Sequence, residues 1–300
     1  MSRDPDEASK VFAQHPTSFD AQTSRFVSHA RSGAHPLMAA NSFPPSTNTA
    51  MTRVDGKIER LDLPDAGSWV IPGVTWGRVD ELFTPAFWKY QAWLMGLEGT
   101  EPRNHSLGRT LREEVAACLL GGHGIPAEVG IAAFERLRDE GVLRKGTVDR
   151  SRIYSELSRP LSVGSRYVRY RFVEQRTRYL AEALSRLSAE SPPSQSDRDF
   201  RRWLTTFRGI GLKTASWITR NWLNSDDVAI IDIHVYRGGL ISGVFSPEQH
   251  PQRHYLTLES RFLAFARALP VRASVLDILM WRNLRLLNDL ASELTRARRQ

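Results

Sequence analysis

The sequence has almost no cysteine. Cys118 is the single cysteine among 300 residues, which excludes an intramolecular disulfide, a Cys-rich zinc site and a four-cysteine iron–sulfur cluster. No apolar run approaches the roughly 18 residues that cross a bilayer, and the N-terminus lacks the basic start and apolar core of a secretory signal. A reducing compartment, the cytoplasm with its nucleoid, is therefore the expected location.

Lysine is nearly as scarce. Thirty-six of the 41 basic residues are arginines, and only five are lysines: Lys10, Lys57, Lys89, Lys145 and Lys213. The two side chains differ chemically, because an amine can lose its proton and form a Schiff base whereas a guanidinium cannot. Because the sequence uses arginine for nearly all of its positive charge, a lysine at a candidate site indicates that an amine is needed there.

The positive charge lies in the larger, C-terminal part of the chain. The formal net charge is +8, and residues 1–75 hold seven basic against eight acidic side chains, so the other 225 residues carry +9. A basic folded part favours a polyanionic partner. A solvated Arg-rich surface explains the charge equally well.

Composition divides the chain into three stretches. Residues 1–50 end in the turn-forming run SFPPSTNT and are predicted to be a disordered tail. Residues 51–105 are predicted to be an N-terminal extension with a short extended segment at 67–76 and an aromatic helix at 85–96. Helical periodicity dominates residues 106–300, so the predicted fold class is all-α, with an irregular N-terminal extension.

Helices are expected where apolar residues recur at helical spacing between glycine and proline signals. They are predicted at 107–120, 125–140, 168–187, 197–207, 214–222, 233–240, 253–269 and 274–294. A tight turn joins the pair at 197–207 and 214–222, and the hairpin so formed spans 199–222. No strand-rich region and no internal repeat is expected after residue 100.

The turn of this hairpin consists of Gly209, Ile210 and Gly211. Glycine adopts positive φ without steric cost and lets another backbone come close, and Ile210 is expected to anchor the turn in the core. The free N–H groups and positive dipole end of the following helix form an anion site that suits a DNA phosphate. Taken alone, a GxG turn more often belongs to an ordinary helical hairpin.

Two residues, one in the hairpin and one after it, add chemistry to this region. Lys213 starts the second helix and is the only lysine after residue 145. An amine held near a helix N-terminus and partly desolvated loses its proton more readily, which suits a nucleophile. Asp232 lies nineteen residues later, just before the next predicted helix. It is expected to cap that helix, and a cap also fixes the orientation of a catalytic carboxylate.

GIGLK followed by IDIH resembles the helix-hairpin-helix DNA glycosylase superfamily. In that family a hairpin lysine attacks the anomeric carbon of the damaged nucleoside and a downstream aspartate assists, and Lys213 and Asp232 match these positions. His234 matches a position that meets the DNA backbone in related enzymes. The resemblance implies two helical subdomains around a cleft, catalysis by Lys213 and Asp232, and DNA contacts through residues 209–211 and His234.

Three stretches resemble the archaeal-type 8-oxoguanine DNA glycosylase branch more closely. KTASWITRN matches its hairpin helix, Arg166–Leu184 its VRFxNxRAxxI helix, and Leu276–Trp281 its LDLxLW-like segment. In that branch the tryptophan stacks on the extruded base and the aspartate lies in the base pocket. The resemblance therefore implies these roles for Trp281 and Asp277, and it covers about residues 107–290.

The base pocket has alternative interpretations. Asp277 and Trp281 are four residues apart and share a helix face, which also suits a core tryptophan beside a buried aspartate. Trp217 shares a helix face with Lys213 and either borders the pocket or packs in the core. The long N-terminal extension and the nineteen residues after Trp281 depart from the compact archaeal enzymes. Arg220 and Asn221 are expected to be structural.

The resemblance implies a DNA glycosylase that flips out and excises an 8-oxoguanine-like base, with AP lyase activity through a Schiff base on Lys213. The expected partner is double-stranded DNA with a modified base, and the expected state is a monomer. No membrane, cofactor or metal is expected, because the histidines lack metal-ligand spacing.

Two alternatives stay open. One is the same chemistry on another modified base, such as a hypermodified base of phage DNA in antiphage defence. The other is a non-catalytic helix-hairpin-helix DNA-binding module. The Lys213–Asp232 pair argues against the module, because phosphate binding needs neither residue.

Overall fold

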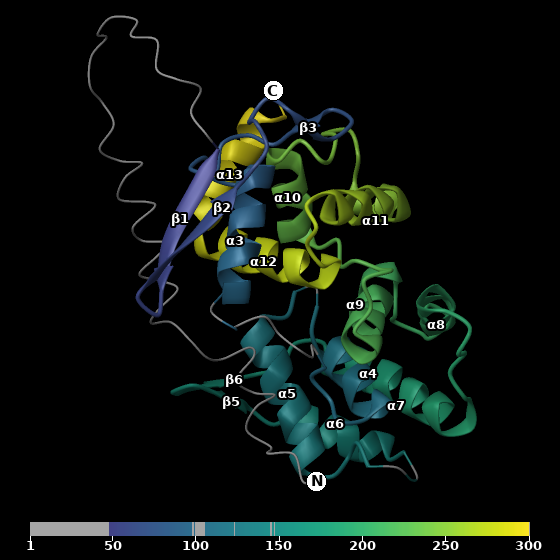
Figure 1. Cartoon of the computed structure of the whole chain (residues 1–300). Coiled ribbons are helices and arrows are strands. Elements are labelled where there is room, and N and C mark those ends of the chain that lie inside the picture. Colours follow the sequence, from purple (N-terminus) through teal and green to yellow (C-terminus); the bar gives the residue numbers. More distant parts are fainter. Residues whose placement is uncertain are drawn as a thin grey trace, which may run out of the picture. The chain divides into compact units, whose positions relative to one another are not determined.

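Helices form most of the described structure in the computed structural model (Figure 1). The structure describes residues 48–97, 99, 106–122, 124–144, 146 and 148–299. The predicted tail lies outside these residues except for its last three positions. Of the helices in the described part of the chain, none combines the length and apolar character that a membrane crossing needs.

The N-terminal extension begins with a β-hairpin. β1 (Thr49–Val54) pairs antiparallel with β2 (Lys57–Asp62), and the turn between them places Asp55 and Gly56 at positive φ. An Asp-Gly pair between two strands is the strongest short-range hairpin signal. The β1–β2 hairpin was not expected, because the predicted extended segment begins only at residue 67.

The predicted extended segment and aromatic helix of the extension are confirmed. β3 (Trp69–Ile71) pairs antiparallel with β4 (Val74–Thr75). α3 (Pro85–Leu97) begins at a proline, whose fixed φ suits the first turn of a helix.

Ten helices follow residue 106 in the described chain, so the helical fold class is confirmed. In chain order they are α4 (Leu111–Leu120), α5 (Ala127–Asp139), α6 (Arg150–Ser158), α7 (Val173–Ala189), α8 (Asp197–Leu204), α9 (Leu212–Leu223), α10 (Ile233–Ile241), α11 (Pro251–Ala268), α12 (Ala273–Leu286) and α13 (Asn288–Ala297).

Three details differ from the prediction. α6 was not expected, and the helix expected at 274–294 is interrupted at Leu287, which leaves helical geometry between α12 and α13. The helix expected from residue 168 starts only at Val173. The residues before it form a short antiparallel hairpin of β5 (Leu161–Val163) and β6 (Arg166–Val168).

The chain divides into two compact units, each built from discontinuous segments. The first comprises Met1–Pro102, Tyr236–Glu248 and Ala264–Gln300, and the second comprises Arg103–Val235 and Gln249–Leu263. The N-terminal extension therefore belongs to the same unit as the C-terminal helices. The predicted domain boundary at residue 105 stays a prediction.

A continuous apolar core holds the second unit together. α4 lies at its centre and packs against α5, α7 and α9. Its side chains Val115, Leu119 and Leu120 are almost completely buried, and each such side chain stabilises the fold by about 1.5–3 kcal/mol. This core gives the α8–α9 hairpin a rigid support.

Aromatic side chains of the extension form part of the core of the first unit. Phe83, Phe87 and Trp88 contact one another edge to face or stacked, and α3 packs on α12. The Trp88 indole donates to Ser242 Oγ at 3.0 Å, and that hydroxyl donates to the Phe83 carbonyl at 2.7 Å. The extension is thereby fixed to the end of α10.

Candidate functional site

The α8–α9 turn is built on one buried anchor and on one glycine at a position with no room for a side chain. Ile210 is 3% exposed, which confirms the predicted anchor. Gly209 has φ of +82°, and a Cβ added there would lie 2.2 Å from Cδ2 of Tyr179 on α7. Gly211 has an ordinary φ of −87° and open space where its Cβ would point. Packing therefore requires the first glycine, whereas the position of the second leaves room for a Cβ.

This contrast predicts different effects for two alanine substitutions. Gly209→Ala combines a left-handed backbone with overpacking against Tyr179 and is expected to lower the free energy of unfolding by about 2–4 kcal/mol. Gly211→Ala, the matched control, is expected to cost at most about 1 kcal/mol, the loss of a good N-cap residue. Urea unfolding measures both values. Equal losses would show that neither the left-handed backbone nor Tyr179 restricts position 209.

α9 starts with its backbone donors uncovered. Gly211 is its N-cap, no side chain caps it, and no acidic residue lies in its first turn. The first N–H groups therefore keep their partial positive charge toward the turn. Arg208 in the turn and Arg178 are both exposed, and the Arg178 guanidinium lies over the Tyr179 ring that touches Gly209. The surface around the turn is thus suited to a phosphate.

Lys213 is the second residue of α9 and is half-buried. Among the residues that the structure describes, its ammonium has no hydrogen-bond or ion-pair partner. A lysine that served stability would be expected to pair with a carboxylate. The amine is therefore available to an incoming group.

Asp232 caps α10, as predicted. Its Oδ1 accepts hydrogen bonds from the backbone N–H groups of His234 at 2.9 Å and Val235 at 2.8 Å. Its other oxygen, Oδ2, has no hydrogen-bond partner within the described chain. One oxygen thus fixes the carboxylate, and the other is free to face a developing positive charge.

The last turn of α9 is held by a buried carboxylate that the sequence did not reveal. Glu114 of α4 accepts hydrogen bonds from the Asn221 amide at 2.6 Å and from the backbone N–H groups of Leu107 and Gly108. Burial raises the pKa of this carboxyl. The contact gives Asn221 the structural role predicted for it and leaves the N-terminal end of α9 to carry Lys213.

Trp217 lies against the core of the second unit. Its ring reaches Gly121 at the end of α4, where an added Cβ would lie 3.2 Å from the ring. This packing accounts for the tryptophan without a ligand. A place for Trp217 at the border of a base pocket stays a prediction.

Asp277 and Trp281 lie on α12 in the first unit. Asp277 is 3% exposed, Trp281 is half-buried, and the Arg285 guanidinium lies 5.1 Å from the centre of the Trp281 ring. The burial of Asp277 and the one-turn spacing to Trp281 are expected if both residues line a base pocket. They are expected equally if both residues pack in the core. Their role in a base pocket stays a prediction.

The described residues contain no cluster of histidine, cysteine, aspartate and glutamate that could hold a metal ion. His105 and His123 lie outside these residues. The single thiol, Cys118, is buried on α4, and burial raises its pKa.

Comparison with known proteins decides the family. A sequence model of the family described as Ogg-HhH, 8-oxoguanine DNA glycosylase, matches residues 100–271, more than half of the chain. The chain belongs to the 8-oxoguanine DNA glycosylase family. The resemblance drawn from GIGLK and IDIH is thereby confirmed. The matched stretch of this family member contains Lys213, Asp232 and His234, whereas Asp277 and Trp281 lie beyond its end.

Curated relatives of this 8-oxoguanine DNA glycosylase family member include archaeal proteins. The 8-oxoguanine DNA glycosylase/AP lyases of Saccharolobus islandicus strains Y.N.15.51 and L.S.2.15 are each 30% identical over 123 residues, which cover 38% of this chain. The aligned region spans 58% of the length of these curated relatives.

Two solved structures of Methanocaldococcus jannaschii proteins are also similar. The 8-oxoguanine DNA glycosylase is 26% identical with a TM-score of 0.46, covering 57% of this chain and 76% of that one. The 8-oxoguanine glycosylase/lyase in complex with a 15mer DNA containing 8-oxoguanine is 21% identical with a TM-score of 0.44, covering 66% and 88%.

Proposed function

We propose that the protein is a DNA glycosylase that excises an oxidised guanine such as 8-oxoguanine from duplex DNA and then cleaves the strand as an AP lyase. The observation that carries the proposal is the amine of Lys213, which lies at the uncapped start of the hairpin helix without a partner among the described residues. Membership of the 8-oxoguanine DNA glycosylase family supports it, as do the relatives named 8-oxoguanine DNA glycosylase/AP lyase.

The proposed reaction starts with extrusion of the base, because the anomeric carbon cannot be reached inside the duplex. The amine of Lys213 gives up a proton to solvent and forms a bond to that carbon, and the bond to the base breaks with its electron pair leaving on the base. Asp232 Oδ2 stabilises the positive charge that develops on the sugar. Opening of the sugar ring gives a Schiff base on Lys213, and β-elimination of the 3′ phosphate then nicks the strand.

Phosphate binding at the hairpin orients the substrate in this proposal. The exposed arginines 178 and 208 and the free N–H groups of α9 surround the turn. The β5–β6 region adds Arg166, Arg169 and Arg171, all exposed and without an ion pair among the described residues. Contacts to phosphates position a duplex without reading its sequence. We propose that one chain suffices for this, so that the protein acts as a monomer.

A second candidate is the same chemistry on a different modified base, including a hypermodified base of phage DNA. The observation that favours it is the packing of α3 on α12. The extension thereby reaches the helix that carries Asp277 and Trp281, the residues predicted to meet the base. A base pocket that the N-terminal extension helps to line would accept a base of a different shape.

A panel of duplexes separates these proposals. Each duplex carries one modified base, either 8-oxoguanine, another oxidised or alkylated base, or a hypermodified pyrimidine, beside an unmodified control. We expect cleavage of the 8-oxoguanine strand, measured on denaturing gels with and without alkali to separate excision from strand cleavage. Cleavage only of another duplex supports the second candidate, and binding without cleavage of any duplex supports a DNA-binding module.

A further inference from the structure

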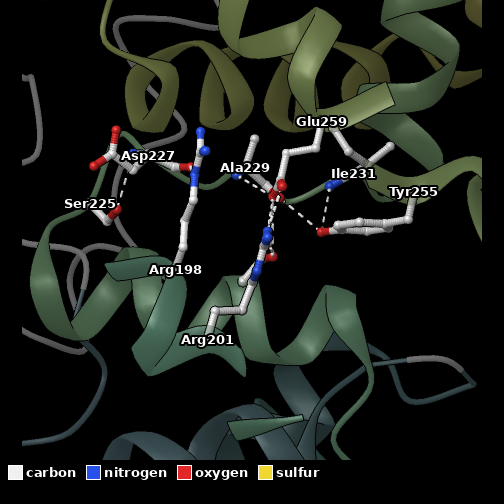
Figure 2. A network of polar contacts seen from close by, with 9 residues as sticks. Arg198, Arg201, Ser225, Asp227, Ala229, Ile231, Tyr255 and Glu259 are labelled. Carbon is white, nitrogen blue, oxygen red and sulfur yellow. Dashed lines mark hydrogen bonds and ion pairs between the residues drawn. The ribbon is translucent and has the colours of Figure 1, made fainter. Parts of the chain in front are cut away.

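A buried ion pair joins α8, the first helix of the hairpin, to α11. Glu259 on α11 is 4% exposed and Arg201 on α8 is 9% exposed. The Arg201 guanidinium contacts both carboxylate oxygens of Glu259 at 2.5 Å through its Nη1. Figure 2 shows Arg201 reaching from its helix to the carboxylate. Neither residue belongs to the proposed chemistry.

The same carboxylate holds two other elements. Its Oε1 accepts hydrogen bonds from the backbone N–H of Ala229 at 3.0 Å and from the Ser216 hydroxyl on α9 at 3.4 Å. Glu259 therefore joins α8, α9 and the segment at 228–231 at a single buried point.

Tyr255 completes this cluster one turn earlier on α11. Its hydroxyl donates to the Ala229 carbonyl at 2.8 Å and accepts from the Ile231 N–H at 3.3 Å (Figure 2). Burial raises the pKa of the hydroxyl, so it stays protonated and keeps donating. The backbone on both sides of Ile230 is thus fixed by one side chain.

The positions of these contacts connect them to the candidate site. Ser216 is three residues after Lys213 and lies on the same side of α9. Ile231 directly precedes Asp232 in the chain. We propose that Arg201, Glu259 and Tyr255 form a positioning clamp that holds the segment carrying Asp232 in register with the helix carrying Lys213. This inference rests on the proposed function and assigns none of the three residues a contact with DNA.

Stability alone does not require a buried ion pair at this position. A buried ion pair loses solvation, and apolar residues of similar volume often stabilise a fold as well or better. The hydrogen bond from the Ala229 N–H to Glu259 is directional and therefore sets the position of the Ala229 backbone. Apolar packing does not fix a backbone in this way. Catalytic groups lose about 100-fold in rate when misplaced by about 1 Å, so a rigid link between Asp232 and Lys213 has a direct use.

Two double variants separate positioning from stability. Arg201→Met with Glu259→Gln removes both charges but keeps an oxygen that accepts the Ala229 N–H. Arg201→Met with Glu259→Leu removes the charges and the acceptor. Tyr255→Phe removes only the hydroxyl and is the mildest change. Leu157→Ala, in the core at α6, is the control for a general loss of stability.

The first readout is hydrogen exchange and needs no activity. The amides of Ile231, His234 and Val235 are expected to exchange about 10-fold faster in Tyr255→Phe and in the leucine double variant. They are expected to keep their wild-type rates in the glutamine double variant and in Leu157→Ala. Equal exchange in the glutamine and leucine double variants would overturn the clamp, whether or not the wild-type protein cleaves any duplex.

The second readout is single-turnover excision over a range of protein concentrations. The maximal rate is expected to fall by about 30–100-fold in the leucine double variant and to stay within about 3-fold of wild type in the glutamine double variant. The protein concentration at half-maximal rate is expected to change less than about 2-fold in both, since the phosphate contacts are intact. If the fall in maximal rate were proportional to the fall in melting temperature across all four variants, the positioning role would be contradicted. A wild-type protein that cleaves no duplex would instead overturn the proposed function and leave the exchange result standing.

Discussion

Lys213→Gln is expected to abolish covalent trapping on DNA by borohydride and to slow excision by about 10⁴-fold or more, the scale seen when a nucleophile is removed. Glutamine has nearly the length of lysine but no amine that can attack the sugar. Because the Lys213 ammonium has no partner among the described residues, the free energy of unfolding is expected to change by less than about 0.5 kcal/mol. The measurement is a borohydride adduct on a gel beside single-turnover excision.

Two control variants make this result specific. Lys213→Arg keeps the positive charge without a usable nucleophile, so it is expected to bind DNA and form no adduct. Lys89 is a second partly buried lysine, whose pKa is lowered by burial and whose amine donates to the Pro270 carbonyl at 3.2 Å. Lys89→Gln is expected to keep the adduct. An adduct that survives in Lys213→Gln would show that another amine is the nucleophile.

Asp232→Asn is expected to lower the excision rate by about 10²–10³-fold while α10 stays folded. Asparagine caps helices as well as aspartate does, so the hydrogen bonds to the His234 and Val235 N–H groups can persist. The neutral amide no longer stabilises the positive charge that develops on the sugar, and electrostatic groups of this kind contribute about 10²–10³-fold. Single-turnover excision and thermal melting measure the two effects separately.

Another helix cap supplies the matched control for this aspartate. Asp149 caps α6 and accepts a hydrogen bond from the Arg152 N–H at 3.0 Å. Asp149→Asn makes the same chemical change at a cap outside the candidate site, and its excision rate is expected to stay within about 2-fold of wild type. If Asp232→Asn kept the wild-type rate as well, Asp232 would be a helix cap and nothing more.

Local sequence patterns predicted most of the helices and the arrangement of the hairpin. Apolar spacing located α3, α4, α5 and α9 to within a few residues, because each helix must bury one stripe of side chains. Position 209 requires positive φ and has no room for a Cβ, a condition that only glycine satisfies. The cap by Asp232 is a contact over three residues and is therefore also local.

Short elements whose signals lie in turns were harder to predict. The β1–β2 hairpin follows from Asp55-Gly56, but its strands lie in a stretch of mixed polarity. The interruption at Leu287 between α12 and α13 carries no glycine or proline, so the apolar period continues across it. At the hairpin, the mixed polarity of the strands concealed the Asp-Gly turn. At Leu287, the continuing apolar period predicted one unbroken helix.

By itself, the sequence determined the helical class, the hairpin turn, the cap at Asp232 and the position of Lys213 at the start of α9. All of these depend on residues within a few positions of one another. Only the tertiary structure decided that the N-terminal extension shares a unit with the C-terminal helices and that Glu259 reaches Arg201 across 58 residues. A buried carboxylate is tolerated only where folding brings donors to it from distant segments, and no local pattern records which segments those are.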